Sequence, residues 1–212
     1  MAWLKRILDF FLALCGSVLL APAFLIIALL IKLRSPGPVL YRGTRVGRGG
    51  RPFQVLKFRT MVTGADKMGG PSTADNDPRV TGIGRVLRKC KLDELPQFIN
   101  ILKGEMSFVG PRPEVPFYVN MFTEEEKQIL TVRPGLTDWA SLWNPDEGAI
   151  LAGSVDPEKT YMENIRPTKV RLQLEYVRRS SLGTDLRIMI QTLGLVLFRI
   201  RPSGLRKFED KA

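Results

Sequence analysis

The sequence predicts an α+β fold with three successive parts: a re-entrant membrane helix–break–helix, a small β-hairpin and a mostly helical cytoplasmic domain. Residues 10–31 carry no charge, a run of about 22 residues where roughly 20 are needed to cross a bilayer. Two strand-like segments then flank a turn, and most later segments have apolar residues at helical spacing. We therefore expect an anchor over residues 1–34 and a cytoplasmic domain with interfacial amphipathic helices over residues 35–212.

The uncharged run is expected to enter and leave the membrane by one face. Pro22 has no N–H to donate and its ring clashes with the preceding turn, so a break is expected at Ala21-Pro22. Ser17, one turn earlier, is expected to satisfy backbone groups freed there. Both flanks are basic and positive charge tends to stay cytoplasmic, which favours a re-entrant pair over a straight span. The flanking charges are Lys5 and Arg6 before the run and Lys32, Arg34, Arg42, Arg45 and Arg48 after it.

A β-hairpin is expected from residues 39–46 and 53–61, which a Gly-rich turn joins. In the second strand Lys57 and Arg59 share one face, opposite the apolar residues beside them. Two interpretations of this face stay open. It is either a solvated basic edge that discourages strand aggregation, or a clamp for phosphate groups.

Periodicity and punctuation predict the remaining elements. They are a mobile loop at 63–78, a basic helix at 82–89, a rigid loop at 106–114, a helix opening at Thr123, a turn-rich loop at 133–139, a surface helix at 170–179 and an apolar helix at 185–199. The last helix is too short and interrupted to span a bilayer, so it is either interfacial or part of the core. In the rigid loop, two prolines flank Arg112 and pre-organise it for a bidentate phosphate contact.

Two adjacent carboxylates, Asp93 and Glu94, lie where the sequence predicts that a helix begins. Proline is tolerated only in a first turn, so Pro96 places Asp93 at or next to the N-cap, and Lys103-Gly104 ends the helix. The helix dipole there favours an ionised carboxylate or a bound phosphate. An ionised Asp is available as a nucleophile toward phosphorus. The alternative is an ordinary Asp cap followed by a solvated Glu.

Composition restricts the chemistry further. The formal net charge is +11, which indicates acidic partners such as nucleic acid, anionic lipid or phosphorylated substrates. The chain has no histidine, so a Ser-His-Asp triad, a Cys-His pair and a His-ligated zinc site are excluded. Its two cysteines, Cys15 and Cys90, make a disulfide framework improbable and fit a reducing compartment.

Several motifs, taken in order, resemble those of a known family. They are Lys57-Phe58-Arg59-Thr60-Met61, Asp77-Pro78-Arg79, Leu92-Asp93-Glu94-Leu95-Pro96-Gln97, the segment 104–112 and Arg133-Pro134-Gly135. The chain is similar in these to the bacterial sugar transferases, the small monotopic polyprenol-phosphate phosphoglycosyl transferases. The resemblance covers nearly the whole chain, which looks like the minimal catalytic form.

The resemblance implies an enzyme that moves a phosphosugar from a nucleoside diphosphate sugar, usually UDP-linked, to membrane undecaprenyl phosphate. UMP would be released, in the first membrane step of glycan assembly. Asp93 would be the nucleophile and form a covalent aspartyl phosphosugar. Glu94 would act as a general base or assist the metal, and Mg²⁺ would bind at Asp93 and Glu94. The re-entrant anchor is also implied, with the catalytic domain on the cytoplasmic face of the bacterial inner membrane.

The same resemblance assigns substrate contacts and partners. The expected substrate-binding residues are Lys57, Arg59, Arg88, Gln97, Arg112 and Arg133. The expected partners are a nucleotide sugar, polyprenol phosphate and membrane lipids, with no nucleic acid, and a homo-oligomer is left open. Two competing classes remain: a membrane-tethered basic protein that binds nucleic acid or headgroups, and a partner of a multispan transporter. Scattered aromatic residues argue against nucleic acid.

The chain departs from the family pattern at two places. The family often has Ser-Pro at the membrane break, whereas this chain has Ala21-Pro22, without the hydroxyl. After Arg133-Pro134-Gly135 the commoner continuation is Thr-Gly-x-Ala-Gln-Val-Asn. Here residues 137–144 read Thr-Asp-Trp-Ala-Ser-Leu-Trp-Asn, which we interpret as a sign of a different donor sugar.

Overall fold

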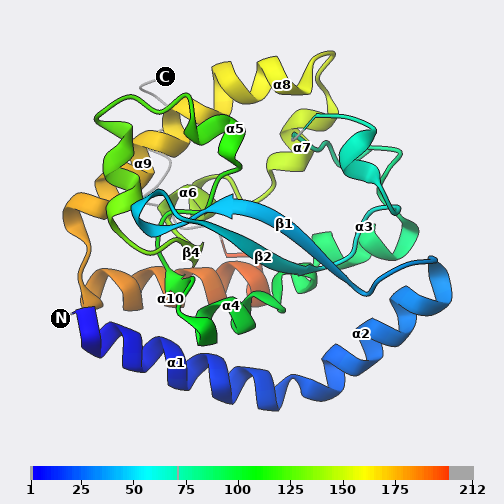
Figure 1. Ribbon diagram of the computed structural model, residues 1–212, viewed down its shortest axis with the longest axis horizontal. Coiled ribbons are helices and arrows are strands. Elements are labelled where there is room, and N and C mark those ends of the chain that lie inside the picture. The colour runs from blue at the N-terminus through cyan, green and yellow to red at the C-terminus, as the bar shows by residue number, and fades with distance from the viewer. Residues whose placement is uncertain (1, 71, 201–212) are drawn as a thin grey trace.

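The computed structural model describes residues 2–70 and 72–200 and shows a mixed, mostly helical α+β fold, as predicted (Figure 1). A bent pair of N-terminal helices precedes a β-hairpin and a set of mainly short helices. The helices after the hairpin are α3 (Gly82–Lys89), α4 (Gln97–Lys103), α5 (Pro116–Val119), α6 (Trp139–Trp143), α7 (Glu147–Ala152), α8 (Pro157–Thr160), α9 (Arg166–Arg179) and α10 (Leu182–Phe198).

The N-terminal segment forms two helices, α1 (Ala2–Leu19) and α2 (Ala21–Arg34), bent by 61° at Leu20. Pro22 lies in the first turn of α2, where its missing N–H costs no helical bond, so the predicted break is confirmed. In the described residues no single helix has the length and apolarity to cross a membrane, although this pair together does. Ser17 does not satisfy the backbone groups at the break, although we expected it to. Its hydroxyl donates to the Ala13 carbonyl at 2.7 Å, the usual i−4 acceptor within a helix.

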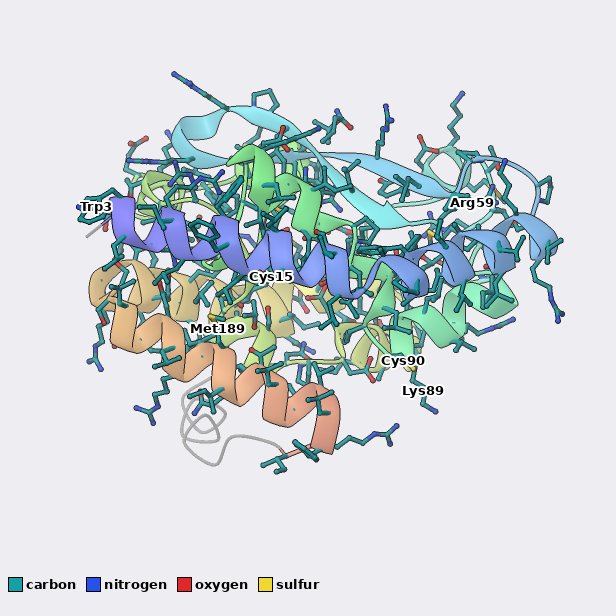
Figure 2. All side chains as sticks on the ribbon, turned by 90° about the horizontal axis from the view of Figure 1, so that it is seen from below. Trp3, Cys15, Arg59, Lys89, Cys90 and Met189 are labelled. Carbon is teal, nitrogen blue, oxygen red and sulfur yellow. The ribbon has the colours of Figure 1, made fainter. Side chains whose placement is uncertain are left out.

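An apolar face covers the side of the molecule formed by α1, α2 and α10; in Figure 2, α2 continues from α1 and α10 runs beside α1. Many large apolar side chains there are solvent-exposed, and an exposed area of this extent marks an interaction surface. They include Trp3, Phe11, Val18 and Leu19 on α1, Leu25, Ile26, Leu29 and Leu33 on α2, and Leu186, Ile190, Leu193, Leu197 and Phe198 on α10.

Polar side chains attach α1 to the rest of the chain. Lys5 Nζ donates to the Val109 carbonyl at 2.8 Å and forms an ion pair with Asp185 of α10. Asp9 is buried, and its Oδ1 accepts from the Phe108 amide at 3.1 Å. The N-terminal half of α1 is therefore held by specific contacts as well as by apolar packing.

Two small sheets follow. The predicted hairpin is confirmed as antiparallel strands β1 (Leu40–Val46) and β2 (Pro52–Phe58). A second, parallel pair, β3 (Ser107–Val109) and β4 (Gly135–Thr137), lies in segments that we expected to be loops. A Cβ on Gly135 would overlap the backbone of Gly110, so this close approach needs glycine.

The carboxylate pair lies in a 3₁₀ turn, Leu92–Glu94, and not at the start of a helix. Pro96 cannot donate to the Leu92 carbonyl, which instead accepts from Leu95, so α4 begins only after Pro96. The prediction that Asp93 caps this helix is therefore wrong. The predicted stop is confirmed, because Gly104 ends α4 with φ +82°.

Asn100 of α4 fixes this turn against the hairpin. Its side chain accepts from the Leu56 amide at 2.9 Å and donates to the Gln54 carbonyl at 2.7 Å. It therefore makes the hydrogen bonds with the β2 backbone that a neighbouring strand would otherwise make. Because Asn100 is fully buried, these bonds also satisfy polar groups that would otherwise be costly. The contact aligns Lys57, the next residue of β2, with the 3₁₀ turn.

Two expectations for the second half need correction. The predicted surface helix is α9, and seven of its residues are buried, among them Lys169 and Gln173. The helix expected to open at Thr123 is a short 3₁₀ segment, Glu126–Thr131, although Thr123 and Glu126 do cap each other reciprocally.

Candidate active site

Asp93 is a buried carboxylate, only 6% exposed, in the 3₁₀ turn between α3 and α4. The nearest cation is Lys57, whose Nζ lies 4.0 Å from Oδ2. No side-chain hydrogen bond reaches the Asp93 carboxylate from any described residue. Burial raises the pKa of Asp93, and the charges of Lys57 and Arg112 oppose that rise. A carboxylate with free oxygens, held beside cations, is suited to attack an electrophile.

Glu94 differs from Asp93 in that both of its oxygens are already paired. Oε1 binds Lys57 Nζ at 2.7 Å and also Arg112, and Oε2 accepts from Arg112 Nη1 at 3.1 Å. Burial opposes the ionisation of Glu94, but Arg112 and Lys57 outweigh it and lower its pKa well below the usual range. Glu94 is therefore a poor proton acceptor at neutral pH.

Arg88 of α3 brings a third cation toward Asp93. Its Nε donates to Thr60 Oγ1 at 3.0 Å. Burial lowers the pKa of Arg88, and the charges of Asp93, Asp77 and Asp75 act against that decrease. The charges of Lys57, Arg88 and Arg112 thus all act on Asp93, and the predicted contact of these three residues with substrate stays a prediction.

Two predicted substrate-binding residues lie elsewhere. The guanidinium of Arg59 donates to the Ser35 carbonyl at 2.7 Å and to Pro36, just after α2. Arg59 is 5% exposed, so it is not a solvated edge residue either. Arg133 Nε donates to the Gly104 carbonyl at 3.1 Å, at the end of α4. The structure does not bring these arginines to Asp93, and their assignment to substrate stays a prediction.

Gln97, the first residue of α4, is 2% exposed, and its side-chain nitrogen has no hydrogen-bond partner among the described residues. A buried amide without a partner carries a cost that a ligand could remove. Its role in substrate binding also stays a prediction.

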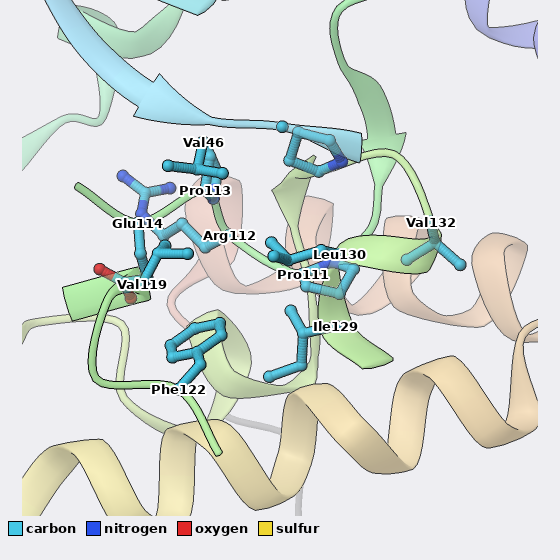
Figure 3. Close-up of a pocket in the computed structure, with 12 residues that line it drawn as sticks. Val46, Pro111, Arg112, Pro113, Glu114, Val119, Phe122, Ile129, Leu130 and Val132 are labelled. Carbon is cyan, nitrogen blue, oxygen red and sulfur yellow. The ribbon is translucent and has the colours of Figure 1, made fainter. Parts of the chain in front are cut away.

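A cavity of about 10 Å³ lies beside Arg112 (Figure 3). It is lined mostly by apolar residues from β1, the 111–114 segment and the stretch that follows, including Val46, Pro111, Val119, Phe122 and Ile129. A cavity of this volume holds about one water molecule at most, so it cannot take a substrate.

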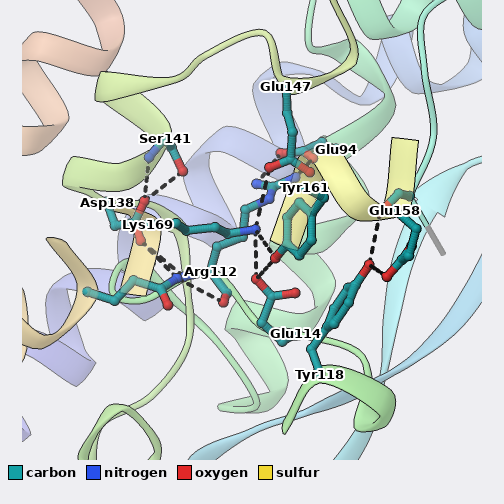
Figure 4. Close-up of polar contacts among 12 residues, drawn as sticks. Glu94, Arg112, Glu114, Tyr118, Asp138, Ser141, Glu147, Glu158, Tyr161 and Lys169 are labelled. Atoms are coloured by element: carbon teal, nitrogen blue, oxygen red, sulfur yellow. Dashed lines mark hydrogen bonds and ion pairs between the residues drawn. The ribbon is translucent and has the colours of Figure 1, made fainter. Parts of the chain in front are cut away.

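A buried charged cluster lies close to Arg112, and the sequence analysis did not find it (Figure 4). Lys169 Nζ forms ion pairs with Glu114 at 2.7 Å and Glu147 at 3.5 Å and donates to Tyr161 Oη at 3.2 Å. Burial alone would lower the pKa of Lys169, but the charges of Glu114 and Glu147 raise it well above its usual value. Tyr161 lies in the π-helical turn that runs directly into α9 and Lys169, whereas Glu114 and Glu147 come from separate segments that no sequence spacing joins to it.

Lys169→Met is expected to lower the free energy of unfolding by about 3–5 kcal/mol, because it leaves Glu114 buried without a cation. Chemical denaturation in detergent would measure the loss. The double variant Lys169→Met/Glu114→Gln should recover part of it, since the unpaired charge is removed. Wild-type stability in Lys169→Met would show that this ion pair contributes nothing.

The site fits only a sparsely ligated metal ion. No group of three or more His, Cys, Asp or Glu side chains with metal-binding geometry occurs within the described residues. Asp93 offers free carboxylate oxygens, whereas Lys57 and Arg112 occupy those of Glu94. Mg²⁺ commonly takes one or two protein carboxylates and completes its shell with phosphate oxygens and water. Asp93 therefore fits Mg²⁺ if a diphosphate supplies further ligands.

A family model and several known proteins match most of this chain. Residues 1–199 match the family model described as bacterial sugar transferase. The chain is 37% identical over 199 residues to the UDP-N-acetylgalactosamine-undecaprenyl-phosphate N-acetylgalactosaminephosphotransferase of Aeromonas hydrophila, covering 92% of this chain and 44% of that protein. It is 41% identical over 200 residues to the UDP-glucose:undecaprenyl-phosphate glucose-1-phosphate transferase of Escherichia coli K12, covering 90% and 39%.

A shorter relative matches along most of its length. The exopolysaccharide production protein PSS of Rhizobium leguminosarum bv. phaseoli is 39% identical over 201 residues, covering 90% of this chain and 93% of that protein. The chain thus spans less than half of the Aeromonas and Escherichia coli relatives and nearly all of the Rhizobium protein.

Proposed function

This chain belongs to the bacterial sugar transferase family, and we propose that it is an enzyme that transfers a sugar 1-phosphate from a UDP-sugar to undecaprenyl phosphate. The products would be undecaprenyl diphosphate sugar and UMP. The names of two relatives support a UDP-sugar donor and an undecaprenyl phosphate acceptor. The name of a third supports a place in exopolysaccharide production, where this transfer would be the first membrane step.

The observation that carries the proposal is the pair of unlike carboxylates. Asp93 has free oxygens beside cations, and Glu94 is fully paired. An oxygen of Asp93 would attack the β-phosphorus of the donor. The bond from that phosphorus to the bridging oxygen would break, and UMP would leave with the electron pair. A phosphate oxygen of undecaprenyl phosphate would then attack the same phosphorus and release Asp93 as a carboxylate.

The neighbouring cations would offset the negative charge that gathers in both steps. Lys57 and Arg88 would face the donor diphosphate, and electrostatic stabilisation of this kind is usually a large contribution to catalysis. Glu94 would act by holding Lys57 and Arg112 in place, because its lowered pKa makes it a weak base. The resemblance implies general-base or metal-assisting work for Glu94, and we propose this holding role in place of the general-base one.

Mg²⁺ is proposed as the cofactor, with Asp93 as its protein ligand and Glu94 contributing less. When bound, it would neutralise charge on the diphosphate and the leaving group. Lys57, Arg88 and Arg112 would do the same from fixed positions in the protein.

The apolar face of α1, α2 and α10 is proposed to lie in the membrane. The bent pair would form a re-entrant hairpin on the cytoplasmic face of the inner membrane, and residues 35–212 would face the cytoplasm. The basic residues on both sides of the hairpin support this orientation. Membrane lipids would then be partners of the anchor, and Asp93 would lie within reach of a lipid phosphate.

Purified chain in lipid nanodiscs with undecaprenyl phosphate and Mg²⁺ would test the proposal. We expect release of UMP and transfer of isotope-labelled sugar to lipid with at least one of a panel of UDP-sugars, and loss of both with a chelator. Failure of every nucleotide sugar to label the lipid would overturn the proposed function.

A further inference from the structure

The backbone of Arg112 is held on both sides by buried side chains from distant elements. Its amide donates to Asp138 Oδ2 at 3.2 Å, and its carbonyl accepts from Gln173 Nε2 at 3.3 Å (Figure 4). Asp138 precedes α6 and is 0% exposed, and Gln173 lies in the middle of α9 and is 1% exposed. A buried polar side chain destabilises the fold unless its hydrogen bonds are satisfied. Asp138 and Gln173 both satisfy theirs in part through the backbone of Arg112.

Asp138 divides its two oxygens between separate tasks. Oδ1 accepts from the amide and the hydroxyl of Ser141, both at 2.7 Å, and so caps α6. Oδ2 binds the Arg112 amide and lies 3.4 Å from Gln173 Nε2. A serine could cap this helix alone, so the capping task does not account for the second oxygen.

From Arg112 a chain of contacts leads to the proposed nucleophile. The guanidinium of Arg112 binds both oxygens of Glu94 and also donates to the Leu136 carbonyl at 3.3 Å. Glu94 binds Lys57 at 2.7 Å, and Lys57 lies 4.0 Å from Asp93. A shift of Arg112 would therefore move the charges that face Asp93.

We propose that Asp138 and Gln173 are positioning residues, which act on the reaction by fixing the backbone of Arg112. This inference rests on the proposed function, because it assigns a task within the same site. Neither residue is expected to touch the donor or the acceptor, since both are buried behind Arg112.

Three variants separate positioning from folding. Asp138→Ser keeps a capping oxygen for α6 but removes the acceptor for the Arg112 amide. Gln173→Met keeps a similar length and volume but removes the donor to the Arg112 carbonyl. Asp156→Ser is the matched control, because Asp156 caps α8 through the Lys159 amide at 3.0 Å and Ser replaces one cap with another.

The first readout is single-turnover UMP release with saturating enzyme in excess over UDP-glucose or UDP-N-acetylgalactosamine, with undecaprenyl phosphate present. At saturation the rate constant is independent of the folded fraction. Asp138→Ser and Gln173→Met should lower it about 10–100-fold, as displaced catalytic groups do. Asp156→Ser should stay within about twofold. A wild-type rate constant in both test variants would overturn the inference.

The second readout needs no activity, so it separates this inference from the proposed function. Amide hydrogen exchange of a peptide containing Arg112 should be faster in Asp138→Ser than in wild type, and unchanged in Asp156→Ser. Unchanged exchange in Asp138→Ser would overturn the inference even if the enzyme transfers sugar phosphate. An inactive wild-type chain with the expected exchange pattern would instead count against the proposed function alone.

Discussion

Asp93→Asn is expected to abolish turnover, with a loss of about 10⁴-fold or more, because the amide cannot form the acyl phosphate on which the proposed reaction depends. The variant should fold, since the two side chains have the same shape and the Asp93 carboxylate makes no side-chain hydrogen bond within the described part of the chain. UMP release and lipid labelling would measure the loss.

Glu94→Gln and Asp66→Asn complete this experiment. Glu94→Gln should leave severely reduced but measurable activity, because it weakens the hold on Lys57 and Arg112 without removing the nucleophile. Asp66 is exposed, so Asp66→Asn should behave as wild type. Near-wild-type activity in Asp93→Asn would remove the nucleophile assignment.

Pro22→Leu is expected to straighten the bent helix pair and shift part of the protein to a true membrane crossing, with loss of activity. Leucine supplies the N–H that proline lacks, so a continuous helix from α1 into α2 becomes possible. The uncharged run is long enough to span once straight. In a crossing, the two basic flanks would lie on opposite sides of the membrane, against the usual distribution of positive charge.

Cysteine labelling would measure this change of topology. Ala2→Cys and Pro36→Cys would be placed separately in a Cys15→Ala, Cys90→Ala background, and Pro36 is exposed. A membrane-impermeant reagent should label neither position in intact cells and both in permeabilised cells, and Pro22→Leu should expose one of them. Labelling of the two positions from opposite sides with Pro22 present would support a simple span instead.

Local signals were sufficient for much of the fold. The break at Pro22, the hairpin, the basic helix α3 and the stop at Gly104 each depend on a few neighbouring residues with strong conformational preferences. The β3–β4 pair was missed because strands of three residues are too short to show alternation. The burial of α9 was missed because long polar residues such as Lys169 resemble a surface until their distant partners are known.

In the candidate site, too, some features follow from neighbouring residues and others from distant contacts. Lys57, Arg88 and Arg112 were predicted to bind substrate, and in the structure the charges of all three act on Asp93. Arg59 would share a face with Lys57 if the strand continued, but β2 ends at Phe58. The guanidinium of Arg59 instead donates to the carbonyl of Ser35, just after α2. The 137–144 segment was interpreted as a sign of the donor sugar, yet its Asp138 is buried and binds the Arg112 backbone, a contact that only the tertiary structure reveals.

The central claim is that Asp93 becomes covalently bonded to the phosphosugar, and one measurement tests it directly. Enzyme would be incubated with Mg²⁺ and a UDP-sugar labelled in the β-phosphate, with no polyprenol phosphate present. We predict up to one equivalent of UMP per enzyme and a label on the peptide containing Asp93, both absent in Asp93→Asn. Release of UMP that depends strictly on polyprenol phosphate, with no label on the protein, would contradict the covalent route and indicate direct transfer between two bound substrates.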